Sequence, residues 1–450
     1  MHEFTPEVEA LAHEVLAYSL ERMRSNPPLD YPKSHDELYA LAGETITADG
    51  LGGSAALKLF TEILAPACIS TDHPSYLAFI PSAPSEHSNL FDLVVGASAL
   101  YGGSWQEGAG AVYAENQALR WLADLAGLPK SSGGVFVQGG TLGNLSALVA
   151  ARVAARKKFT GVSRWVVAAS KESHSSIVSA AEVMDVGVLL IPTGDDLVLR
   201  GNDAALAIDE YEKSHPGEKV FALVATAGTT NLGIIDDLAS LAPVAKEREL
   251  WFHVDGAYGL AALCAPSVRP LFNGIEHCDS FIVDPHKWLF APYDACALIY
   301  RNPAQGKEAH TQHASYLDTL EDPNEWNPSD YAIHLTRRPR GLPFWYSLAA
   351  NGVNEYVAAM EATLSLAQEA AALIRNHPNL ELLRNPTLSV VAFTRTGWSA
   401  QQYQEWSDKL LEDQIGFVTP SAHGGQPILR FAIVNPWTKV SDLAAILATL

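Results

Sequence analysis

Cysteine and positive charge are both scarce in this 450-residue sequence. Because the cysteines stand far apart and form no C-x-x-C pair, we predict neither a metal site nor a disulfide framework. Only 30 Lys and Arg stand against 51 Asp and Glu, giving a net charge of −21. Phosphate binding needs a basic surface, so this charge argues against nucleic acid as a partner. The four cysteines are Cys68, Cys264, Cys278 and Cys296.

Long apolar runs are also missing. No uninterrupted apolar stretch reaches about 18 residues, so we expect no membrane span. Residues 1–6 do not combine a basic region with an apolar run, so we expect no signal peptide. With 48% hydrophobic and 18% charged residues, the composition is that of a soluble globular enzyme, and isolated thiols favour a cytoplasmic location.

Apolar strands alternate with amphipathic helices from Gly134 onward. Continuous apolar strands separated by such helices predict an α/β fold with a mostly parallel central sheet and helices on both faces. Ligands of such sheets bind beyond the carboxyl ends of the strands. The expected strands span 135–137, 165–168, 186–191, 220–225, 251–254, 280–283 and 296–300, and the helices between them span 142–158, 203–214 and 237–248, with another from about 175.

Length and pattern predict three parts. Residues 1–67 form an N-terminal helical arm, 68–343 the large α/β domain and 344–450 a smaller α+β domain. A polar loop at about 310–330 is long enough to be functional and mobile. Helices outside the alternating region are expected at 6–24 after an N-cap at Thr5, and at 54–64, 89–99, 115–125, 345–374, 401–411 and 442–450, with late strands at 388–393, 416–418 and 428–434.

One lysine stands in an unusual setting. Lys287 follows the apolar strand at 280–283 and lies between His286 and Trp288. Desolvation there would lower the pKa of its amine towards neutrality, and a partly neutral amine can attack a carbonyl carbon. A lone lysine at a strand end more often extends to water, so this interpretation needs support from elsewhere in the chain.

The sequence Gln138-Gly139-Gly140-Thr141-Leu142-Gly143-Asn144 is a glycine-rich turn from strand to helix. Free backbone N–H groups at a helix N-terminus bind phosphate, and Thr141 adds a hydroxyl. The turn matches neither the P-loop nor the dinucleotide-binding pattern. A tight turn that merely needs positive φ angles is the alternative.

Two further polar residues follow apolar strands. Asp255 ends the strand at 251–254, where a carboxylate needs a cationic partner or several donors, although it could also cap the next helix. His174 follows the strand at 165–168 and could stack on a planar ring or carry a proton, although it could equally cap a helix. Thr229 and Thr230 add hydroxyls at the same expected sheet edge.

A phosphate-binding turn, a carboxylate for a ring nitrogen, a stacking imidazole and a nucleophilic lysine together describe a site for pyridoxal phosphate. Their order and spacing resemble the group II pyridoxal-phosphate-dependent decarboxylases, the family of aromatic-L-amino-acid decarboxylase. The matching motifs run from His73-Pro74 to Leu429-Arg430-Phe431-Ala432. The most specific one is His-Val-Asp-x-Ala-Tyr around Asp255, followed by His-Lys-Trp around Lys287.

The resemblance implies a fold of the type I pyridoxal-phosphate-dependent transferase kind, an amino acid substrate and a homodimer. Lys287 would hold the cofactor covalently, and Asp255 would pair with the pyridinium nitrogen. Asp284 stands where the animal enzymes carry asparagine, and because a carboxylate beside phosphate is unfavourable, its role stays open. The implied cofactor-binding residues are Gly140, Thr141, His174, Thr230, Asp255, Ala257, Asp284, His286 and Lys287, and the implied catalytic residues are Lys287, His174, Tyr316 and His286.

The expected substrate is an aromatic L-amino acid. The stretch at 79–82 resembles the ring pocket of the aromatic-acid enzymes, although Thr71 stands where those enzymes carry tryptophan. No arginine dedicated to an acidic substrate is evident, and His174 and His286 are expected near the substrate carboxylate. The candidate substrate residues are Phe79, Ile80, Pro81 and Ser82, with Tyr101 and Trp105 contributed by a partner subunit. Ordinary packing in an interface is the alternative for Phe79 and Trp105.

Several alternatives stay open. A decarboxylase of a non-aromatic amino acid or an aldehyde synthase would share the fold, and Tyr316 argues against the synthase. An aminotransferase would need a carboxylate-binding arginine in the last domain, where Arg430 stands in an expected strand. A non-catalytic relative conflicts with the intact set of catalytic residues. Arg337, Arg338 and Arg340 follow the long loop, and we expect them to tie it to the body by ion pairs.

Tyr316 resembles the residue that delivers a proton to the product carbon. We expect Tyr316→Phe to form less amine and more aldehyde and ammonia, because the unprotonated carbon then meets oxygen. Amine and aldehyde quantified from one incubation measure this split, and an unchanged amine yield would remove Tyr316 from the mechanism.

Overall fold

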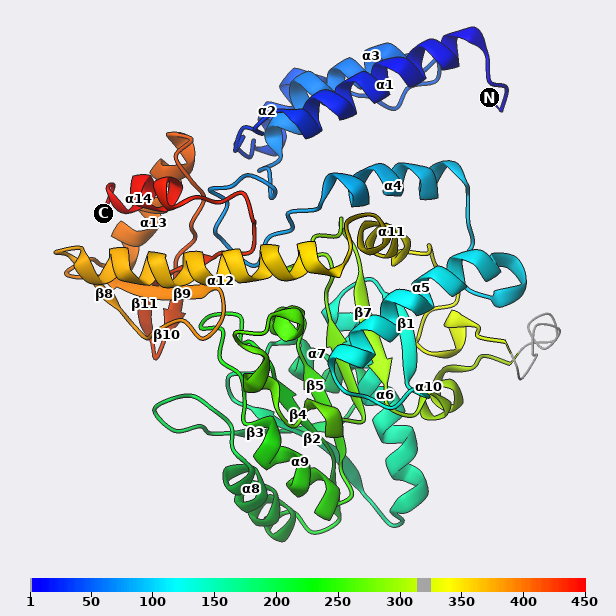
Figure 1. The fold of residues 1–450 in the computed structure, drawn as a ribbon, viewed down its shortest axis with the longest axis vertical. Helices are drawn as coiled ribbons and strands as arrows, with labels where there is room; N and C mark the ends of the chain where they lie inside the picture. The colour runs from blue at the N-terminus through cyan, green and yellow to red at the C-terminus, as the bar shows by residue number, and fades with distance from the viewer. Residues whose placement is uncertain (1, 314–324) are drawn as a thin grey trace.

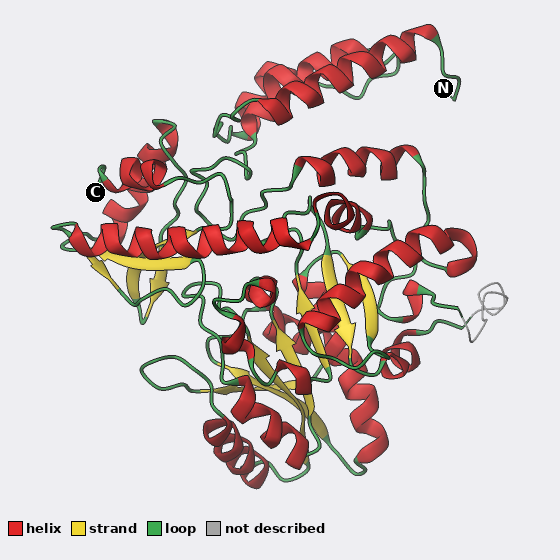
Figure 2. Cartoon of the chain, viewed as in Figure 1, coloured by secondary structure: helices red, strands yellow, loops and turns green. Residues whose placement is uncertain are grey.

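A seven-stranded sheet forms the centre of the protein in a computed structural model that describes residues 2–313 and 325–450 (Figures 1 and 2). The strands lie in the order β1-β7-β6-β5-β4-β2-β3. All seven coincide with strands expected from the sequence. Their bounds are β1 Gly133–Val137, β2 Arg164–Ser170, β3 Gly187–Ile191, β4 Glu218–Thr226, β5 Trp251–Asp255, β6 Ser280–Val283 and β7 Cys296–Tyr300.

Strands β2 to β6 pair in parallel, and β7 runs antiparallel to both of its neighbours. The predicted mostly parallel sheet is therefore confirmed. Side chains alternate between its two faces. On β5, Phe252 and Val254 enter one core, whereas Trp251 enters the other.

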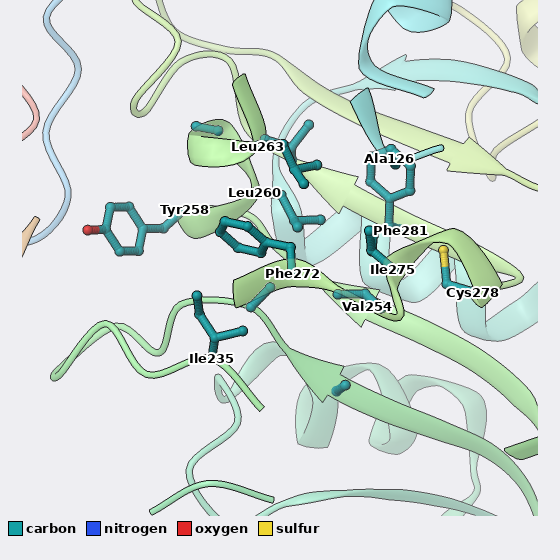
Figure 3. Close-up of a cluster of buried hydrophobic side chains, with 14 of the residues drawn as sticks. Ala126, Ile235, Val254, Tyr258, Leu260, Leu263, Phe272, Ile275, Cys278 and Phe281 are labelled. Atoms are coloured by element: carbon teal, nitrogen blue, oxygen red, sulfur yellow. The ribbon is translucent and has the colours of Figure 1, made fainter. Parts of the chain in front are cut away.

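Helices cover both faces. The core that contains Phe252 and Val254 is shared with α5, α8 and α9, and Figure 3 shows part of it, including Val254, Tyr258, Phe272 and Phe281. The opposite core is formed with α6 and α7. The helices of this region are α4 Glu86–Ala97, α5 Trp105–Leu125, α6 Gly140–Lys158, α7 Ser176–Met184, α8 Gly201–Ser214, α9 Leu238–Glu247 and α10 Pro303–His310.

A second, antiparallel sheet lies near the C-terminus in the order β10-β11-β9-β8. Its elements are β8 Leu380–Leu382, β9 Val390–Arg395, β10 Ser421–His423 and β11 Gln426–Ala432, with helices α13 Ala400–Glu412 and α14 Val440–Leu447. The prediction of a strand at 416–418 is wrong, because Phe417 forms only an isolated bridge to Tyr76. The actual hairpin turns at Gly424 and Gly425, whose φ angles of 56° and 77° suit a two-residue loop.

The helix expected at 345–374 is two helices, α11 Leu342–Asn351 and α12 Val353–Asn376. Gly352 separates them with a φ of 79°, an angle that a helix cannot contain. Among the described residues, α12 alone has the length and apolar composition of a membrane-crossing helix. It lies along the four-stranded sheet, as Figure 1 shows, and several of its side chains enter that core.

The N-terminal arm consists of α1 Pro6–Arg24, α2 His35–Ala42 and α3 Gly53–Leu59. The predicted N-cap is confirmed, since the Thr5 side chain accepts a hydrogen bond from the Val8 amide. None of the three helices contains a buried residue, and Figure 1 shows them lying apart from the body. The division into 1–67, 68–343 and 344–450 stays a prediction.

The arginines after the long loop do form ion pairs, as expected. Arg337 pairs with Glu115 at 2.8 Å, Arg338 with Asp92 at 2.7 Å, and Arg340 with Asp294. Only the first pair is buried, with side chains that are 1% and 3% exposed. Glu115 also accepts the Gly341 amide, so this carboxylate joins α5 to the start of α11.

Replacing Arg337 by alanine would leave the buried Glu115 charge uncompensated. We expect Arg337→Ala to lower the free energy of unfolding by about 3–5 kcal/mol, measured by urea denaturation. Arg338→Ala is the matched control, because its pair is 41% and 33% exposed. It should cost no more than about 1 kcal/mol, and equal losses in the two variants would contradict this account.

Candidate active site

A cavity of about 460 Å³ opens at the carboxyl ends of the parallel strands. Segments that follow β1, β2, β4, β5 and β6 line it, which is where ligands of such sheets bind. The structure therefore brings together residues that the sequence spreads over more than 200 positions. The predicted residues among its lining are Phe79, Ile80, Gly140, Thr141, His174, Thr230, Asp255, Ala257, Asp284, His286 and Lys287.

The other predicted site residues lie elsewhere. Ser82 lines an adjoining cavity of about 740 Å³, which shares Tyr293 with the first. The Tyr101 hydroxyl donates to the Leu335 carbonyl, and Trp105 begins α5. Neither cavity includes Pro81 in its lining. A contribution of Tyr101 and Trp105 to a partner's site stays a prediction, and Tyr316 lies outside the described residues.

Asp255 ends β5 and is buried, with 5% of its surface exposed. One oxygen accepts the Asn144 side-chain amide at 2.9 Å, and the other accepts the Ala257 backbone amide at 3.1 Å. Neither donor carries a charge, and none of the ion pairs within 2–313 and 325–450 involves Asp255. A buried carboxylate held only by neutral donors favours a cationic ligand group at the cavity.

Lys287 lies 3.0 Å from Asp284, whose side chain is 1% exposed. Burial acts to lower the pKa of Lys287, as the sequence predicted. The charge of Asp284 and its hydrogen bond, with the charge of Asp255, outweigh burial and raise that pKa instead. The predicted downward shift is therefore wrong, because the sequence did not reveal that Asp284 faces the lysine.

The glycine-rich turn leads directly into α6. Gly139 is the N-cap and provides no side-chain hydrogen bond, so the first amides of the helix are available to an anion. A Cβ on Gly140 would stand 3.2 Å from the Ala257 side chain and 3.3 Å from Asp284 Oδ2. Glycine therefore allows the helix start to approach Ala257 and Asp284.

Two histidines lie on the cavity surface. The Nδ1 atom of His174 is 3.0 Å from the Ser176 hydroxyl and receives the Ser176 amide at 3.1 Å, which leaves Nε2 free for the cavity. His286 is anchored through Nδ1 to the backbone of Ala295 at 2.8 Å. Its ring lies 5.2 Å from that of Tyr293.

Sequence reasoning missed several lining residues, including Asn144, Ser176, Tyr293 and Asp294. Asn144 stands four positions after Gly140 in a helix, and this spacing puts both residues on one face. A polar residue on the face that packs against an apolar sheet was the signal that could have identified it.

Comparison with known proteins identifies the family. The pyridoxal-dependent decarboxylase conserved domain matches residues 53–396, well over half of the chain. The chain belongs to the pyridoxal-dependent decarboxylase family. It is therefore a lyase that acts on an amino acid and depends on pyridoxal phosphate.

The relatives differ in the reactions that their names record. Aromatic-L-amino-acid decarboxylase of Bacillus atrophaeus is 28% identical over 98% of this chain and 94% of its own. A 3,4-dihydroxyphenylacetaldehyde synthase of Aedes aegypti is 27% identical, over 90% of this chain and 81% of its own. Histidine decarboxylase of Rattus norvegicus is also 27% identical, over 85% and 61%.

The fold agrees with this family. A crystal structure of Oryza sativa TDC with PLP and tryptamine superposes with a TM-score of 0.90, at 24% identity and over 99% of both chains. The predicted fold type, with its smaller α+β part, is thereby confirmed.

The cavity residues fit pyridoxal phosphate. The α6 N-terminus with Thr141 would hold the phosphate, Asp255 the ring nitrogen and Lys287 the aldehyde carbon. When bound, the cofactor supplies an electron sink for breaking the bond between the substrate's α-carbon and its carboxylate. Asp284 fits less simply, because its carboxylate shares the α6 N-terminus with the phosphate, although the helix dipole favours negative charge there.

Replacing Asp284 by asparagine removes the charge that raises the pKa of Lys287. The neutral amine should then exist at lower pH, and the cofactor-free Asp284→Asn protein should capture pyridoxal phosphate with a lower pH midpoint. The rate at which the bound cofactor's visible absorbance develops, measured across a pH series, reports this midpoint.

Asp294→Asn is the matched control, since Asp294 lines the same cavity but pairs with Arg340. Its midpoint should equal that of the unmodified protein. If Asp284→Asn also leaves the midpoint unchanged, Asp284 does not control the pKa of Lys287.

Proposed function

We propose that this decarboxylase acts on an aromatic L-amino acid and releases the amine and CO2. The observation that carries the proposal is the composition of the cavity wall beyond the cofactor-binding residues. Phe79, Ile80 and Tyr293 present apolar and aromatic surface. Lys287 is the sole Lys or Arg that lines the cavity within the described part of the chain.

The same observation disfavours an acidic substrate. A second carboxylate on the substrate would need a cationic partner, and Lys287 is engaged by the cofactor. Arg430, which an aminotransferase would need at the cavity, is 5% exposed and donates to the Phe79 carbonyl at 2.7 Å. It is absent from the described lining of the cavity.

His174 and His286 are the groups that we place beside the substrate carboxylate. An imidazole can hold the carboxylate through a hydrogen bond without the full positive charge that would oppose the departure of neutral CO2. Tyr316 would then return a proton to the α-carbon. These roles support a decarboxylase over an aldehyde synthase, which is the relevant alternative because such a synthase is among the relatives.

We also propose a homodimer. The arm helices carry exposed apolar side chains on elements with no buried residue, such as Leu16, Tyr39 and Leu41. Apolar area of this kind favours burial against another chain, and a second copy would cover it symmetrically. A mass of one chain in solution, measured by light scattering, would refute the dimer.

A cytoplasmic location is proposed as well. Free cysteines at all four positions suit a reducing compartment. Cell fractionation tests the location, and recovery outside the cytoplasm would refute it.

The decisive experiment incubates the pyridoxal-phosphate-loaded enzyme with tryptophan, tyrosine, phenylalanine, histidine and glutamate, and quantifies CO2 and amine. We expect kcat/KM for the best aromatic acid to exceed that for glutamate by at least about a hundredfold, because glutamate would bury an unpaired charge. Lys287→Ala is the control and should abolish turnover and the absorbance band that borohydride bleaches.

Each alternative predicts a different product. Preference for histidine or glutamate would overturn the substrate class. Aldehyde with ammonia would identify an aldehyde synthase, and a keto acid without CO2 an aminotransferase. Unchanged turnover in Lys287→Ala would overturn the assignment of that lysine.

A further inference from the structure

A row of buried polar side chains crosses the apolar layer between the central sheet and α6. Trp251, His253 and Asp255 alternate along β5 on the face that packs against α6, and Ser280 stands beside His253 on β6. Asn144 faces them from α6. His253 and Ser280 are 0% exposed and Asn144 is 1% exposed. Their neighbours on this face are apolar, so the row is not explained by packing.

The direction of every hydrogen bond in the row follows from one ionised group. The Asp255 carboxylate only accepts, so the Asn144 amide nitrogen faces it, at 2.9 Å. The Asn144 carbonyl oxygen then faces His253 Nε2, also at 2.9 Å, and this ring nitrogen must carry the proton. His253 Nδ1 therefore accepts the Ser280 hydroxyl at 2.8 Å.

Trp251 is the last residue of the row. Trp251 Nε1 donates to the Ser280 oxygen at 2.8 Å, so Ser280 has its own proton left for His253. Every polar atom along this path has a partner. Burial lowers the pKa of His253 to about 4, against the opposing charge of Asp255 and the Ser280 backbone, so the ring is neutral at physiological pH.

A branch from Asn144 reaches the other side of the cavity. Its amide nitrogen also donates to the Ser176 oxygen at 2.9 Å. The Ser176 hydroxyl is 3.0 Å from His174 Nδ1, which already accepts the Ser176 backbone amide. Because Nδ1 is an acceptor, the hydroxyl donates to it and the His174 proton resides on Nε2, the atom left free for the cavity.

We propose that Asn144 is a positioning residue that orients Asp255 and fixes the tautomer of His174, and that His253 holds the Asn144 amide in place by pairing its oxygen. One amide thus links the group assigned to the ring nitrogen with the group assigned to the substrate carboxylate. The proposal rests on the proposed function, because it assumes those two assignments.

The support of the amide oxygen is the critical element. Without a donor at position 253, the buried Asn144 oxygen has no partner, and the amide is no longer held from both ends. Asp255 and Ser176 would then lose the fixed position of their shared donor.

The test compares two replacements of His253 in the cofactor-loaded enzyme. Glutamine can accept from Ser280 and donate to Asn144, whereas phenylalanine fills a similar shape but donates nothing. We expect His253→Gln to keep kcat within about threefold and His253→Phe to lower it about ten- to a hundredfold, with KM nearly unchanged. The absorbance band of the bound cofactor should shift in His253→Phe alone.

A merely structural role predicts that His253→Phe lowers the melting temperature alone. Phenylalanine leaves the Asn144 oxygen and the Ser280 hydroxyl buried without His253 as partner, so this variant should melt below His253→Gln. Low kcat and a shifted band in folded His253→Phe protein, measured well below its melting temperature, therefore support positioning. Equal kcat and equal absorbance in the two variants would overturn the proposal.

Replacing Asn144 or Ser176 tests the path to Asp255 and the path to His174 separately. Asn144→Leu should weaken pyridoxal phosphate binding about tenfold and lower kcat, because both branches lose their donor. Ser176→Ala should lower kcat but leave cofactor affinity unchanged, since it interrupts only the path to His174. If Asn144→Leu fails to fold, Ser176→Ala and the His253 pair still test the proposal, and normal kcat in all of them would overturn it.

Ser146→Ala is the matched control. Ser146 is a 0% exposed polar residue on the same helix, but it bonds the Ile333 amide and stands outside the row. Its loss should leave cofactor affinity and the absorbance band unchanged. An effect equal to that of Asn144→Leu would mean that α6 responds to any buried change, which would overturn a specific role for Asn144.

The substrate panel distinguishes the two levels of the argument. A preference of the unmodified enzyme for glutamate would overturn the proposed function itself. A preference for an aromatic acid, together with unchanged kcat, cofactor affinity and absorbance in the Asn144 and His253 variants, would overturn the positioning role alone.

Discussion

The structure depends on one carboxylate that is buried at the edge of the central sheet and faces the cavity. Asp255 is buried at the end of β5, and its two oxygens are held by neutral donors from Asn144 and Ala257. Burial without a cation is unfavourable in isolation. A protonated ring nitrogen of bound pyridoxal phosphate would supply a compensating positive charge, so the burial of Asp255 fits this cofactor.

The sheet and α6 create that arrangement together. The parallel strands end at one edge, and the first turn of α6 brings unpaired amides and its positive dipole end to the same edge. Asp284 uses the same dipole while holding the Lys287 ammonium at 3.0 Å. Asp284 thus raises the pKa of Lys287 from a position beside the first turn of α6.

The sequence could predict whatever depends on local pattern. Seven apolar runs predicted the seven strands of the central sheet. The motifs around Asp255 and Lys287 predicted that both residues lie at the same edge of that sheet. It could not predict partners that come from tertiary packing. The pKa of Lys287 rises because Asp284 turns towards it, and this orientation is not encoded in the spacing of the two residues.

Other misses have similar causes. Asn144 stood within the glycine-rich motif, but its importance arises from His253 on a strand more than 100 residues later. The break between α11 and α12 depends on one glycine, Gly352. Its left-handed φ angle cannot be recognised from the spacing of apolar residues. Strand β10 was missed because a polar three-residue strand has too little alternation to be recognised, although its Gly-Gly turn is a hairpin signal.

The wall of the cavity shows how the C-terminal sheet contributes to the candidate site. Phe79 has a φ of 53°, a left-handed angle that a bulky side chain rarely adopts, and the residue is 56% exposed. Such strain persists only where the surroundings enforce it. Arg430 on β11 donates to the Phe79 carbonyl at 2.7 Å, and the Ala432 amide donates to the Leu77 carbonyl.

Arg430 is itself unusual, because its guanidinium is buried. Burial lowers its pKa to about 10, against the opposing influence of Tyr258, but the group stays charged at neutral pH. A charged donor makes a stronger hydrogen bond to a carbonyl than a neutral one does. The cost of burying this arginine is therefore offset by a firm hold on the backbone at Phe79. The smaller sheet therefore holds Phe79, a residue that lines the cavity at the edge of the larger sheet, so the packing of the two sheets sets the position of this side chain.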